Sequence, residues 1–436
     1  MKLRNIIRIT ALFLIFGYVL IYSIEYLQAC IKKSNRQPIE ESLVLHRNKD
    51  PMAIKNGQNL NDFTSDTSNQ IIWHLTDGVM PFLDTYKISN LPETIPDLLL
   101  PYEDSIALYA KLIKASPMAY PFEDTITRSG YIPRLPFHMY ATRLLHLKVR
   151  WLLKNGEFKN ALETTRLILE IGTKLDMLEG PTILTLLGNS VKDQGAKAAA
   201  DCIKFIPETF PVSFSDLSSD LLTARLQDTG IINSLVYDYE QDKNLLMHIK
   251  TAPPLIIFTA GEHPKEKAEY GWWQRFHMYL YYDADETINW TRNDMASIIE
   301  AAKLPFFMVD TSYLPEYRKK PEMMSEGYNG LFGFLRIKWN YPTNYMGRTW
   351  YWSTHGVLLR YERMLMYRAS INARLNITYI ACKLHDQKVL PITLRDLKLS
   401  QSVLINPLTG QQPEYVPKKR SISTFLMENE KYEVSF

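Results

Sequence analysis

The sequence predicts a mainly α-helical protein: a helical-hairpin array with a small carboxyl-terminal β-element and one amino-terminal transmembrane helix. Three features of the chain support this class. An uncharged apolar run covers residues 9–24, amphipathic segments with a helical period extend from about residue 100 to residue 387, and strand-like segments follow residue 420. A chain of 436 residues, of which 46% are hydrophobic, is long enough to bury a sizeable core.

These features predict that the chain is divided into four segments. Residues 1–32 are expected to form a signal anchor or transmembrane helix. Residues 33–70 are polar and weakly periodic, which predicts a stalk or lead-in. Residues 71–390 form the predicted α-helical body, and residues 391–436 hold a short helix and a β-hairpin element.

The amino-terminal segment is predicted to cross a membrane once. The uncharged run is short for a bilayer span of about 20 residues, but continuing it through Glu25 to Ile31 makes it long enough. The run is preceded by the basic residues Lys2, Arg4 and Arg8. Because a short basic end usually stays in the cytoplasm, we expect a single-pass protein of the inner membrane whose residues 32–436 are extracytoplasmic, in the periplasm.

Cys30 offers two alternatives to this uncleaved anchor. The sequence "LQAC" resembles the bacterial lipobox, in which Cys30 would be lipidated and become the new amino terminus. Cleavage followed by plain secretion is the other alternative. Gln28 is unusual inside a lipobox, and Glu25 interrupts the apolar run just before it. The uncleaved anchor is therefore favoured, with Cys30 in its last turn.

Charge and cysteine content exclude several classes of protein. Lys and Arg number 50 against 47 Asp and Glu, and the formal net charge of +3 is too small to predict nucleic acid as a partner. The three cysteines allow at most one bridge, so no disulfide framework is expected. Cys202 and Cys382 lie in helical contexts and are predicted to be buried, reduced thiols.

Two glycine–alanine pairs predict helical hairpins in the body. Gly156 separates two amphipathic runs and is followed by Ala161, and Gly195 and Ala200 repeat that spacing. A glycine can end a helix in the left-handed conformation, and a small alanine lets the next helix approach closely. Tetratricopeptide-type repeats use the same arrangement of a glycine turn and a small residue at the contact between paired helices. Because the aromatic and proline positions of that repeat are mostly absent, we expect paired helices and not a regular superhelix.

Further helices are expected at residues 215–228, 265–282, 291–303 and 353–387. Thr291 and Asp294 form a capping-box pattern at the start of the third. In the fourth, the arginines are predicted to lie opposite the residues spaced for core contact, which are Leu358, Tyr361, Leu365, Tyr367 and Ile371.

After the long helices, the end of the chain is predicted to hold short elements and turns. Thr393 with Asp396 is predicted to open a short helix, and Pro407 and Gly410 mark a turn. The segment 421–436 is predicted to form two short strands about a Glu-Asn-Glu turn.

Two blocks of sequence carry a resemblance to known proteins. "NGEFKNALETTRLILEIGTKLDMLEGPTILTLLGN", and "LHDQKVLPITLRDL" followed by "NPLTGQQPEY", resemble a set of signal-anchored bacterial proteins to which no activity is assigned. Their helical bodies end in a small Asp-Pro-aromatic-x-Gly-x-x-x-x-Tyr β-element, which is also similar to the carboxyl-terminal β-region of pseudopilin-like proteins. Here Asn406 replaces the aspartate and Leu408 the aromatic residue. The resemblance implies the architecture given above and no chemistry.

Candidate catalytic residues are few. The chain contains no dinucleotide-binding, P-loop, nucleophile-elbow or zinc-protease motif, and no cofactor or metal is predicted. Glu262 beside His263 is a candidate acid–base pair, and Asp283 is a candidate carboxylate. For Asp283 an acidic loop before a helix is the favoured interpretation. His138 and His146 fall on one helix face and are expected to have structural roles.

Aromatic residues are concentrated between residues 272 and 352, where most of the eight tryptophans lie. The candidate binding residues are Trp272, Trp273, Trp350 and Trp352, because aromatic faces near Asn and Arg suit sugar stacking or a protein partner. The alternative is that these wide side chains fill a helical core.

Together these features predict a membrane-anchored extracytoplasmic helical protein that acts as a binding or scaffold module toward a protein or glycan. The alternative function is that of a cell-envelope hydrolase or glycan-binding enzyme. Its site would lie near the aromatic-rich region 272–352, with Glu262 or Asp283 as acid or base.

Overall fold

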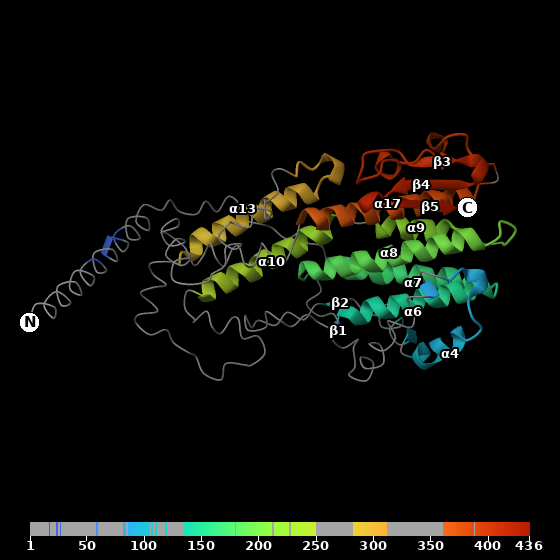
Figure 1. The fold of residues 1–436 in the computed structure, drawn as a ribbon, viewed down its shortest axis with the longest axis horizontal. Coiled ribbons are helices and arrows are strands. Elements are labelled where there is room, and N and C mark those ends of the chain that lie inside the picture. Colours follow the sequence, from blue (N-terminus) through green and yellow to red (C-terminus); the bar gives the residue numbers. More distant parts are fainter. Residues whose placement is uncertain are drawn as a thin grey trace, which may run out of the picture.

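The structure, a computed structural model, describes four stretches of the chain: residues 86–104, 135–249, 282–311 and 361–436, with gaps at 179, 212, 226–227 and 388. Isolated positions are also described, namely residues 17, 23–24, 27, 58–59, 82–83, 106–107, 110 and 118–119. In these residues the fold is mainly helical, and a small three-stranded sheet lies at the carboxyl terminus (Figure 1). No helix in this part of the chain is long and apolar enough to cross a membrane, and the predicted anchor lies outside it except for single positions.

Five helices form the first core, with α8 at its centre. Helix α8 packs against α6, α7 and α17, and α9 packs against α7 and α17 (Figure 1). Their bounds are α6 Leu135–Lys154, α7 Phe158–Asp176, α8 Thr182–Phe205, α9 Ser215–Ala224 and α17 Tyr361–His385. Three short helical pieces also pack on this core from the side of α6, and these are η3 Ile88–Asn90, α4 Ile95–Leu99 and η4 Leu100–Tyr102.

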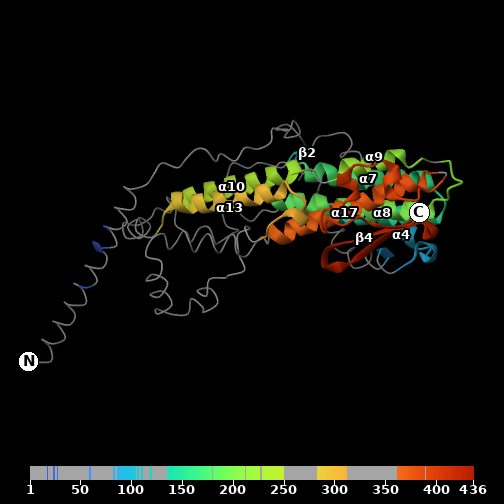
Figure 2. The ribbon, with the colours of Figure 1, turned by 90° about the horizontal axis from the view of Figure 1, so that it is seen from above.

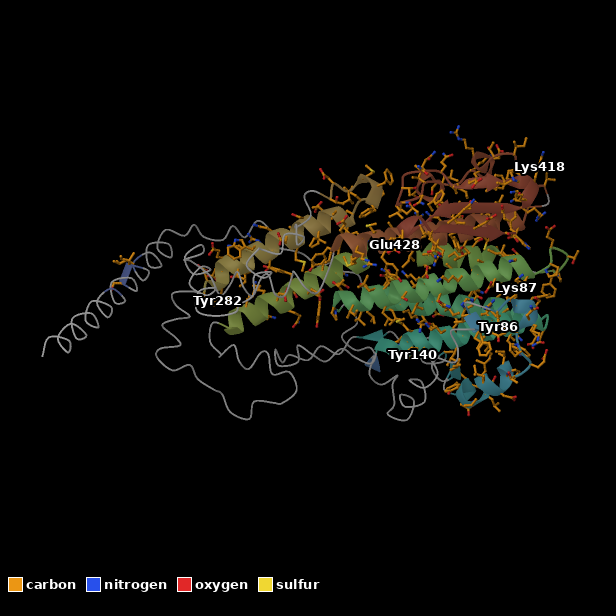
Figure 3. All side chains as sticks on the ribbon, viewed as in Figure 1. Tyr86, Lys87, Tyr140, Tyr282, Lys418 and Glu428 are labelled. Atoms are coloured by element: carbon orange, nitrogen blue, oxygen red, sulfur yellow. The ribbon has the colours of Figure 1, made fainter. Side chains whose placement is uncertain are left out.

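A second core lies where two long helices run side by side and meet the start of α17 (Figure 2). These helices are α10, Asp228–Ile249, and α13, Ala284–Ala302. Tyr282, just before α13, donates its hydroxyl to the carbonyl of Leu246 in α10 at 2.6 Å and so joins their far ends (Figure 3). The short helix η5, Phe306–Met308, follows α13 and contacts α17.

The carboxyl-terminal sheet packs on α17. Its antiparallel order is β3-β4-β5, with β3 Glu414–Val416, β4 Ser421–Phe425 and β5 Lys431–Ser435. Short helices connect the strands and precede them: η6 Leu394–Leu397, α18 Gln401–Leu404, η7 Pro417–Lys419 and η8 Met427–Asn429. A separate two-residue parallel pairing joins β1, Gln58–Asn59, to β2, Met118–Ala119.

The contact between α7 and α8 is a close one because glycines lie in it. A Cβ atom on Gly188 would be 2.5 Å from the backbone nitrogen of Asp176 and 2.9 Å from the carbonyl oxygen of Gly172. Beside these glycines, Lys192 donates through Nζ to Oδ2 of Asp176 at 2.6 Å, and both side chains are 3% exposed or less. The two helices therefore share a buried ion pair whose position depends on the absence of side chains at the glycines.

The first predicted hairpin is confirmed and the second is wrong. Gly156 adopts a left-handed φ of 75° between α6 and α7, and Ala161 is fully buried. Gly195 and Ala200 instead lie inside the continuous helix α8. The glycine there serves close packing, since a Cβ atom on Gly195 would meet the side chain of Leu169 in α7. Glycine inside a helix and glycine after a helix look alike in a sequence.

Two predictions about helix faces and starts are also wrong. Helix α13 begins at Ala284 and not at residue 291, because Asp283 caps it: Oδ1 of Asp283 accepts a hydrogen bond from the backbone nitrogen of Glu286. The arginines of α17 were predicted to face away from the core, yet Arg368 and Arg374 are buried. Helix α17 is covered on one side by the sheet and on the others by α8 and α9, so it has little solvent-facing surface. The predicted helix 265–282 lies almost wholly outside the described residues.

The carboxyl-terminal predictions are mostly confirmed. Thr393 and Asp396 form a capping box, and two strands enclose a turn at Glu428. Asn406 accepts hydrogen bonds from the backbone of the turn through Oδ1 and donates through Nδ2 to the carbonyl of Phe425. An aspartate could not make that donation, which gives a physical reason for asparagine here. The third strand, β3, was not predicted.

Replacing Ala161 with leucine is expected to lower the free energy of unfolding by about 1–3 kcal/mol. Ala161 has no exposed surface at the start of α7, so three added carbon atoms have no free space and would push α7 away from the helices packed on it. Chemical denaturation of the purified full chain measures the effect. An unchanged free energy of unfolding would contradict the close contact assigned to this hairpin.

Candidate functional site

A polar pocket of about 450 Å³ lies between α6, α8 and β5. Helix residues on its walls recur at intervals of three and four, so each helix presents one face to the pocket. From α6 these include Arg143, His146 and Arg150, and from α8 they include Asp193, Lys197, Asp201 and Lys204. With Glu433 of β5, the pocket wall holds four Lys or Arg side chains and three carboxylates: Arg143, Arg150, Lys197 and Lys204 against Asp193, Asp201 and Glu433.

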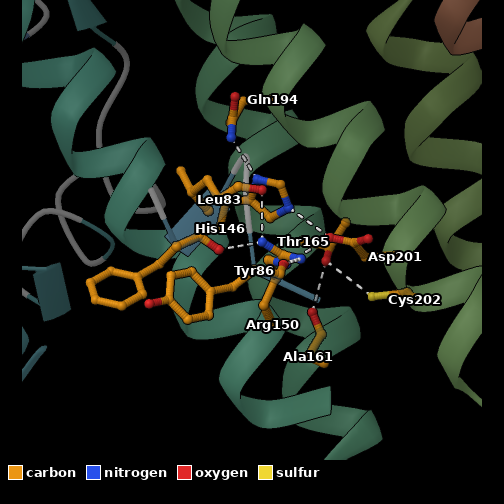
Figure 4. A network of polar contacts seen from close by, with 10 residues as sticks. Leu83, Tyr86, His146, Arg150, Ala161, Thr165, Gln194, Asp201 and Cys202 are labelled. Carbon is orange, nitrogen blue, oxygen red and sulfur yellow. Dashed lines mark hydrogen bonds and ion pairs between the residues drawn. The ribbon is translucent and has the colours of Figure 1, made fainter. Parts of the chain in front are cut away.

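Arg150 fixes the inner wall of the pocket (Figure 4). Its guanidinium donates hydrogen bonds to the backbone carbonyls of Phe82, of Leu83 at 2.7 Å and of Tyr86 at 2.5 Å. Its Nε also lies 3.5 Å from Oδ2 of Asp201. Since the Arg150 side chain is only 8% exposed, these partners compensate the burial of its charge and hold the backbone of Phe82, Leu83 and Tyr86 against α6.

His146 links the two helices behind the same wall (Figure 4). Its Nε2 lies 3.0 Å from Oδ2 of Asp201, and its Nδ1 lies 2.5 Å from the side-chain nitrogen of Gln194. With the Gln194 amide donating to Nδ1, the Nε2–H of His146 donates to Asp201. The structural role expected for His146 agrees with this arrangement. His138, about two turns earlier in α6, is 1% exposed, and burial lowers its pKa to about 4, so it is uncharged at neutral pH.

The outer wall is fixed through α17. Asp193 accepts a hydrogen bond from Arg374 and lies 3.1 Å from Nζ of Lys197. The Arg374 guanidinium lies 4.7 Å from the centre of the Tyr432 ring, and the Tyr432 hydroxyl lies 3.2 Å from that of Thr378. Burial raises the pKa of Tyr432 to about 12, so its hydroxyl stays protonated. These contacts attach β5 to the helices at one side of the pocket.

The balance of charge suits the pocket to binding an anion. Asp201 is held by Arg150 and His146, and Asp193 by Lys197 and Arg374. Among the described residues, neither Arg143 nor Lys204 pairs with a carboxylate, and each has only an aromatic ring beneath its charge: Tyr140 for Arg143 and Phe205 for Lys204. Carboxylates neutralised in this way are poor acids or bases, whereas two cations without carboxylate partners can receive an anion.

The cysteines do not contribute chemistry to this site. Cys202, beside Asp201, is fully buried and lies 3.4 Å from the hydroxyl of Thr165 (Figure 4). Burial raises the pKa of the Cys202 thiol to about 12 and that of Cys382 well above its ordinary value. Both are free and buried, as predicted, and a protonated buried thiol is unreactive.

A second hollow, of about 510 Å³, lies between α4, α6 and the start of α7. Trp151 lines it together with the exposed carboxylates of Glu103, Glu157 and Glu163. It lacks the buried, mutually hydrogen-bonded side chains that fix the walls of the polar pocket. No group of three or more His, Cys, Asp or Glu in the described stretches is placed to hold a metal ion.

Of the site residues predicted from sequence, only Asp283 lies in the described part of the chain. It is 8% exposed and serves as the N-cap of α13, far from the polar pocket in the fold. The others lie outside the described residues: Cys30, Glu262, His263, Trp272, Trp273, Trp350 and Trp352. The pocket itself was missed, although the charged residues of α8 at three- and four-residue intervals were a visible signal.

Two carboxyl groups in the second core have shifted pKa values. Burial raises the pKa of Asp238 to about 6 against the opposing effect of hydrogen bonds from Thr182, whose backbone nitrogen at the start of α8 donates to it at 3.2 Å. Burial, and next the charge of Asp238, raises the pKa of Asp242 to about 7. Both groups therefore hold protons in the folded chain at pH values where exposed carboxyl groups have lost them.

Replacing Asp242 with asparagine is expected to stabilise the protein more at pH 8 than at pH 4. Unfolded, Asp242 loses its proton near pH 4; folded, it keeps the proton to about pH 7. The folded chain binds more protons in this window, so this group's contribution to stability falls as pH rises from 4 to 7. Asparagine removes the charge, and the difference between the two pH values should be about 1 kcal/mol or more. Urea denaturation at both pH values measures it, and an equal effect at the two would contradict the shifted pKa.

Comparison with protein-family models, with curated proteins and with solved structures finds no match to this chain.

Proposed function

We propose that this protein is a membrane-anchored extracytoplasmic binding module that holds an anionic part of a partner in the polar pocket between α6, α8 and β5. The observation that carries this proposal is that Arg143 and Lys204 have no carboxylate partner in the described part of the chain, while two of the pocket's three carboxylates, Asp193 and Asp201, are already neutralised. The pocket volume of about 450 Å³ lies in the usual range for ligand sites, about 300–1,000 Å³.

The rigidity of the pocket walls supports binding. Each wall belongs to a helix or strand that is tied to its neighbours by buried hydrogen bonds, through Arg150 on one side and Arg374 on the other. A preformed site loses little conformational entropy when it binds. A hydrolase would instead use a pair of carboxyl groups beside the substrate, but Asp193 and Asp201 are held by cations and Glu433 is the one lining carboxylate without an ion pair among the described residues.

Photo-crosslinking in the native cells tests this function. A photoreactive amino acid in place of Glu433, which lines the pocket, should give a discrete crosslinked species. The same amino acid in place of Lys159, exposed on α7 outside the pocket, is the matched control and should give none. Failure to crosslink from Glu433, or the same species from both positions, would overturn the proposal.

If the amino-terminal helix is an uncleaved anchor, as proposed, the mature chain should have the mass of the full sequence. The full-length protein should retain Met1 and carry no acyl chain, and Cys30→Ser should leave its mass changed only by the substitution. Intact-mass measurement of the chain purified from membranes decides this, because a lipoprotein would also sediment with membranes. Loss of residues 1–29 with added acyl mass on Cys30 would contradict the helical anchor.

A further inference from the structure

The strand β5 borders the pocket along its edge. Four consecutive residues of it line the cavity, from Tyr432 to Ser435. A cavity that lay over one face of a sheet would be lined by alternate residues, since successive side chains point to opposite faces. In the sheet order β3-β4-β5, the strand pairs with β4 on one side, and in the described part of the chain no strand pairs with its other side.

The hydrogen bonds of the sheet decide which backbone groups of β5 point into the pocket. Phe436 donates through its backbone nitrogen to the carbonyl of Arg420, and Leu426 donates to the carbonyl of Glu430. In an antiparallel pair, residues alternate between those that bond to the partner strand and those that point away. With Ile422 opposite Val434, the even-numbered residues of β5 bond to β4. The N–H and C=O groups of Glu433 and Ser435 therefore face the other edge.

These edge groups have no partner among the described residues: none accepts a hydrogen bond from the backbone nitrogen of Glu433 or Ser435. An exposed row of this kind is a template for one more strand. The two cations without carboxylate partners, Arg143 and Lys204, line the same pocket. The site thus offers strand pairing along one wall and a receptor for negative charge on the others.

We propose that the pocket binds an extended peptide that carries a carboxylate. Its backbone pairs with the free edge of β5 at Glu433 and Ser435, and its carboxylate binds one of the two cations of the pocket, Arg143 or Lys204. This inference rests on the proposed binding function and specifies its ligand. The carboxylate belongs either to the end of the peptide or to an acidic side chain, and the experiment below separates these two sources.

Amide hydrogen exchange of the full chain, resolved to single residues, tests the free edge first. In the ligand-free protein the amides of Glu433 and Ser435 should exchange much faster than those of Tyr432 and Val434, because only the even-numbered amides bond to β4. Equal protection of all four amides would mean that the edge is already covered, and the proposal would fail.

Ligand binding is then tested with two pools of acetylated pentapeptides of mixed sequence, one with free and one with amidated carboxyl termini. The free-acid pool should slow exchange at Glu433 and Ser435 by about tenfold at saturation and leave Tyr432 and Val434 unchanged. If amidated peptides slow these amides only when they contain Asp or Glu, the carboxylate that binds is an acidic side chain of the peptide. If both pools bind regardless of acidic residues, or neither slows these amides, the peptide proposal is overturned.

Three variants complete the test. Arg143→Gln combined with Lys204→Gln should raise the concentration of peptide needed for protection about tenfold or more, while Lys159→Gln on the surface of α7 should not change it.

Ser435→Pro removes an edge N–H that β4 does not use. It should abolish the peptide's protection of the Glu433 amide, while the Val434 amide still exchanges slowly, which confirms a folded sheet. Inorganic phosphate or succinate that binds through Arg143 without protecting these amides would overturn the peptide ligand and leave the proposed anion-binding function intact.

Discussion

Replacing Asp176 with alanine is expected to lower the free energy of unfolding by about 3–5 kcal/mol. The substitution leaves the ammonium group of Lys192 without its carboxylate, 2.6 Å away in the present structure, at a position that is 1% exposed. Arg368, which is also buried, acts on Lys192 with a charge of the same sign, so the lysine would face an unfavourable electrostatic environment. Chemical denaturation of the full chain at neutral pH measures the loss.

The double variant Asp176→Leu with Lys192→Met is the control for this prediction. The double variant removes both charges and fills their volume with apolar side chains. Burying an ion pair costs desolvation energy, which apolar residues do not incur, so the double variant should recover most of the stability that Asp176→Ala loses. A single variant that costs less than about 1 kcal/mol would show that the pair is not buried as described.

Replacing Gly188 with alanine is expected to lower the free energy of unfolding by about 2 kcal/mol, even though alanine favours the helical conformation by about 1 kcal/mol. The added Cβ atom would lie 2.5 Å from the backbone nitrogen and 2.8 Å from the Cα atom of Asp176. Backbone atoms of a packed helix cannot turn aside as a side chain can, so α7 and α8 must separate and weaken the ion pair between them.

Gly195→Ala is the matched control, in the same helix and with the same change. Its Cβ atom would meet the end of the Leu169 side chain, at 2.6 Å from Cδ2, and this side chain can rotate. Because a side chain can yield where backbone atoms cannot, we expect Gly195→Ala to lower the free energy of unfolding clearly less than Gly188→Ala in chemical denaturation. If both glycine variants cost the same, the specific close approach at Gly188 is refuted.

The parts of the fold that depend on local sequence could be predicted. The Gly156 turn, the capping box at Thr393 and the two strands around Glu428 each rest on residues within a few positions of one another.

The predicted start of α13 failed for a local reason, since the cap at Asp283 was passed over for the pattern at Thr291. The other failures come from distant contacts. Gly195 lies inside α8 where Leu169 of α7 packs against it, and Arg374 is buried because the sheet covers α17. A single sequence does not contain these contacts in readable form.

The candidate site could not be predicted for the same reason. Its walls come from α6, α8 and the last strand, so Arg143 and Glu433 are almost 300 residues apart in the chain. A helical face that carries both signs of charge usually indicates a solvated surface. Only the fold shows that the carboxylates of that face are used by Arg150 and Arg374, which leaves Arg143 and Lys204 for a ligand.

The most direct measurement of the central claim compares lysine reactivity in intact native cells with that of the purified, ligand-free chain. If the polar pocket holds a partner in the cell, Lys197 and Lys204 should be acetylated several times more slowly in cells than after purification. Lys159 and Lys418, exposed away from the pocket, should react equally in both preparations. Equal reactivity of Lys197 and Lys204 in the two preparations, with the controls also equal, would contradict the assignment of this pocket as the binding site.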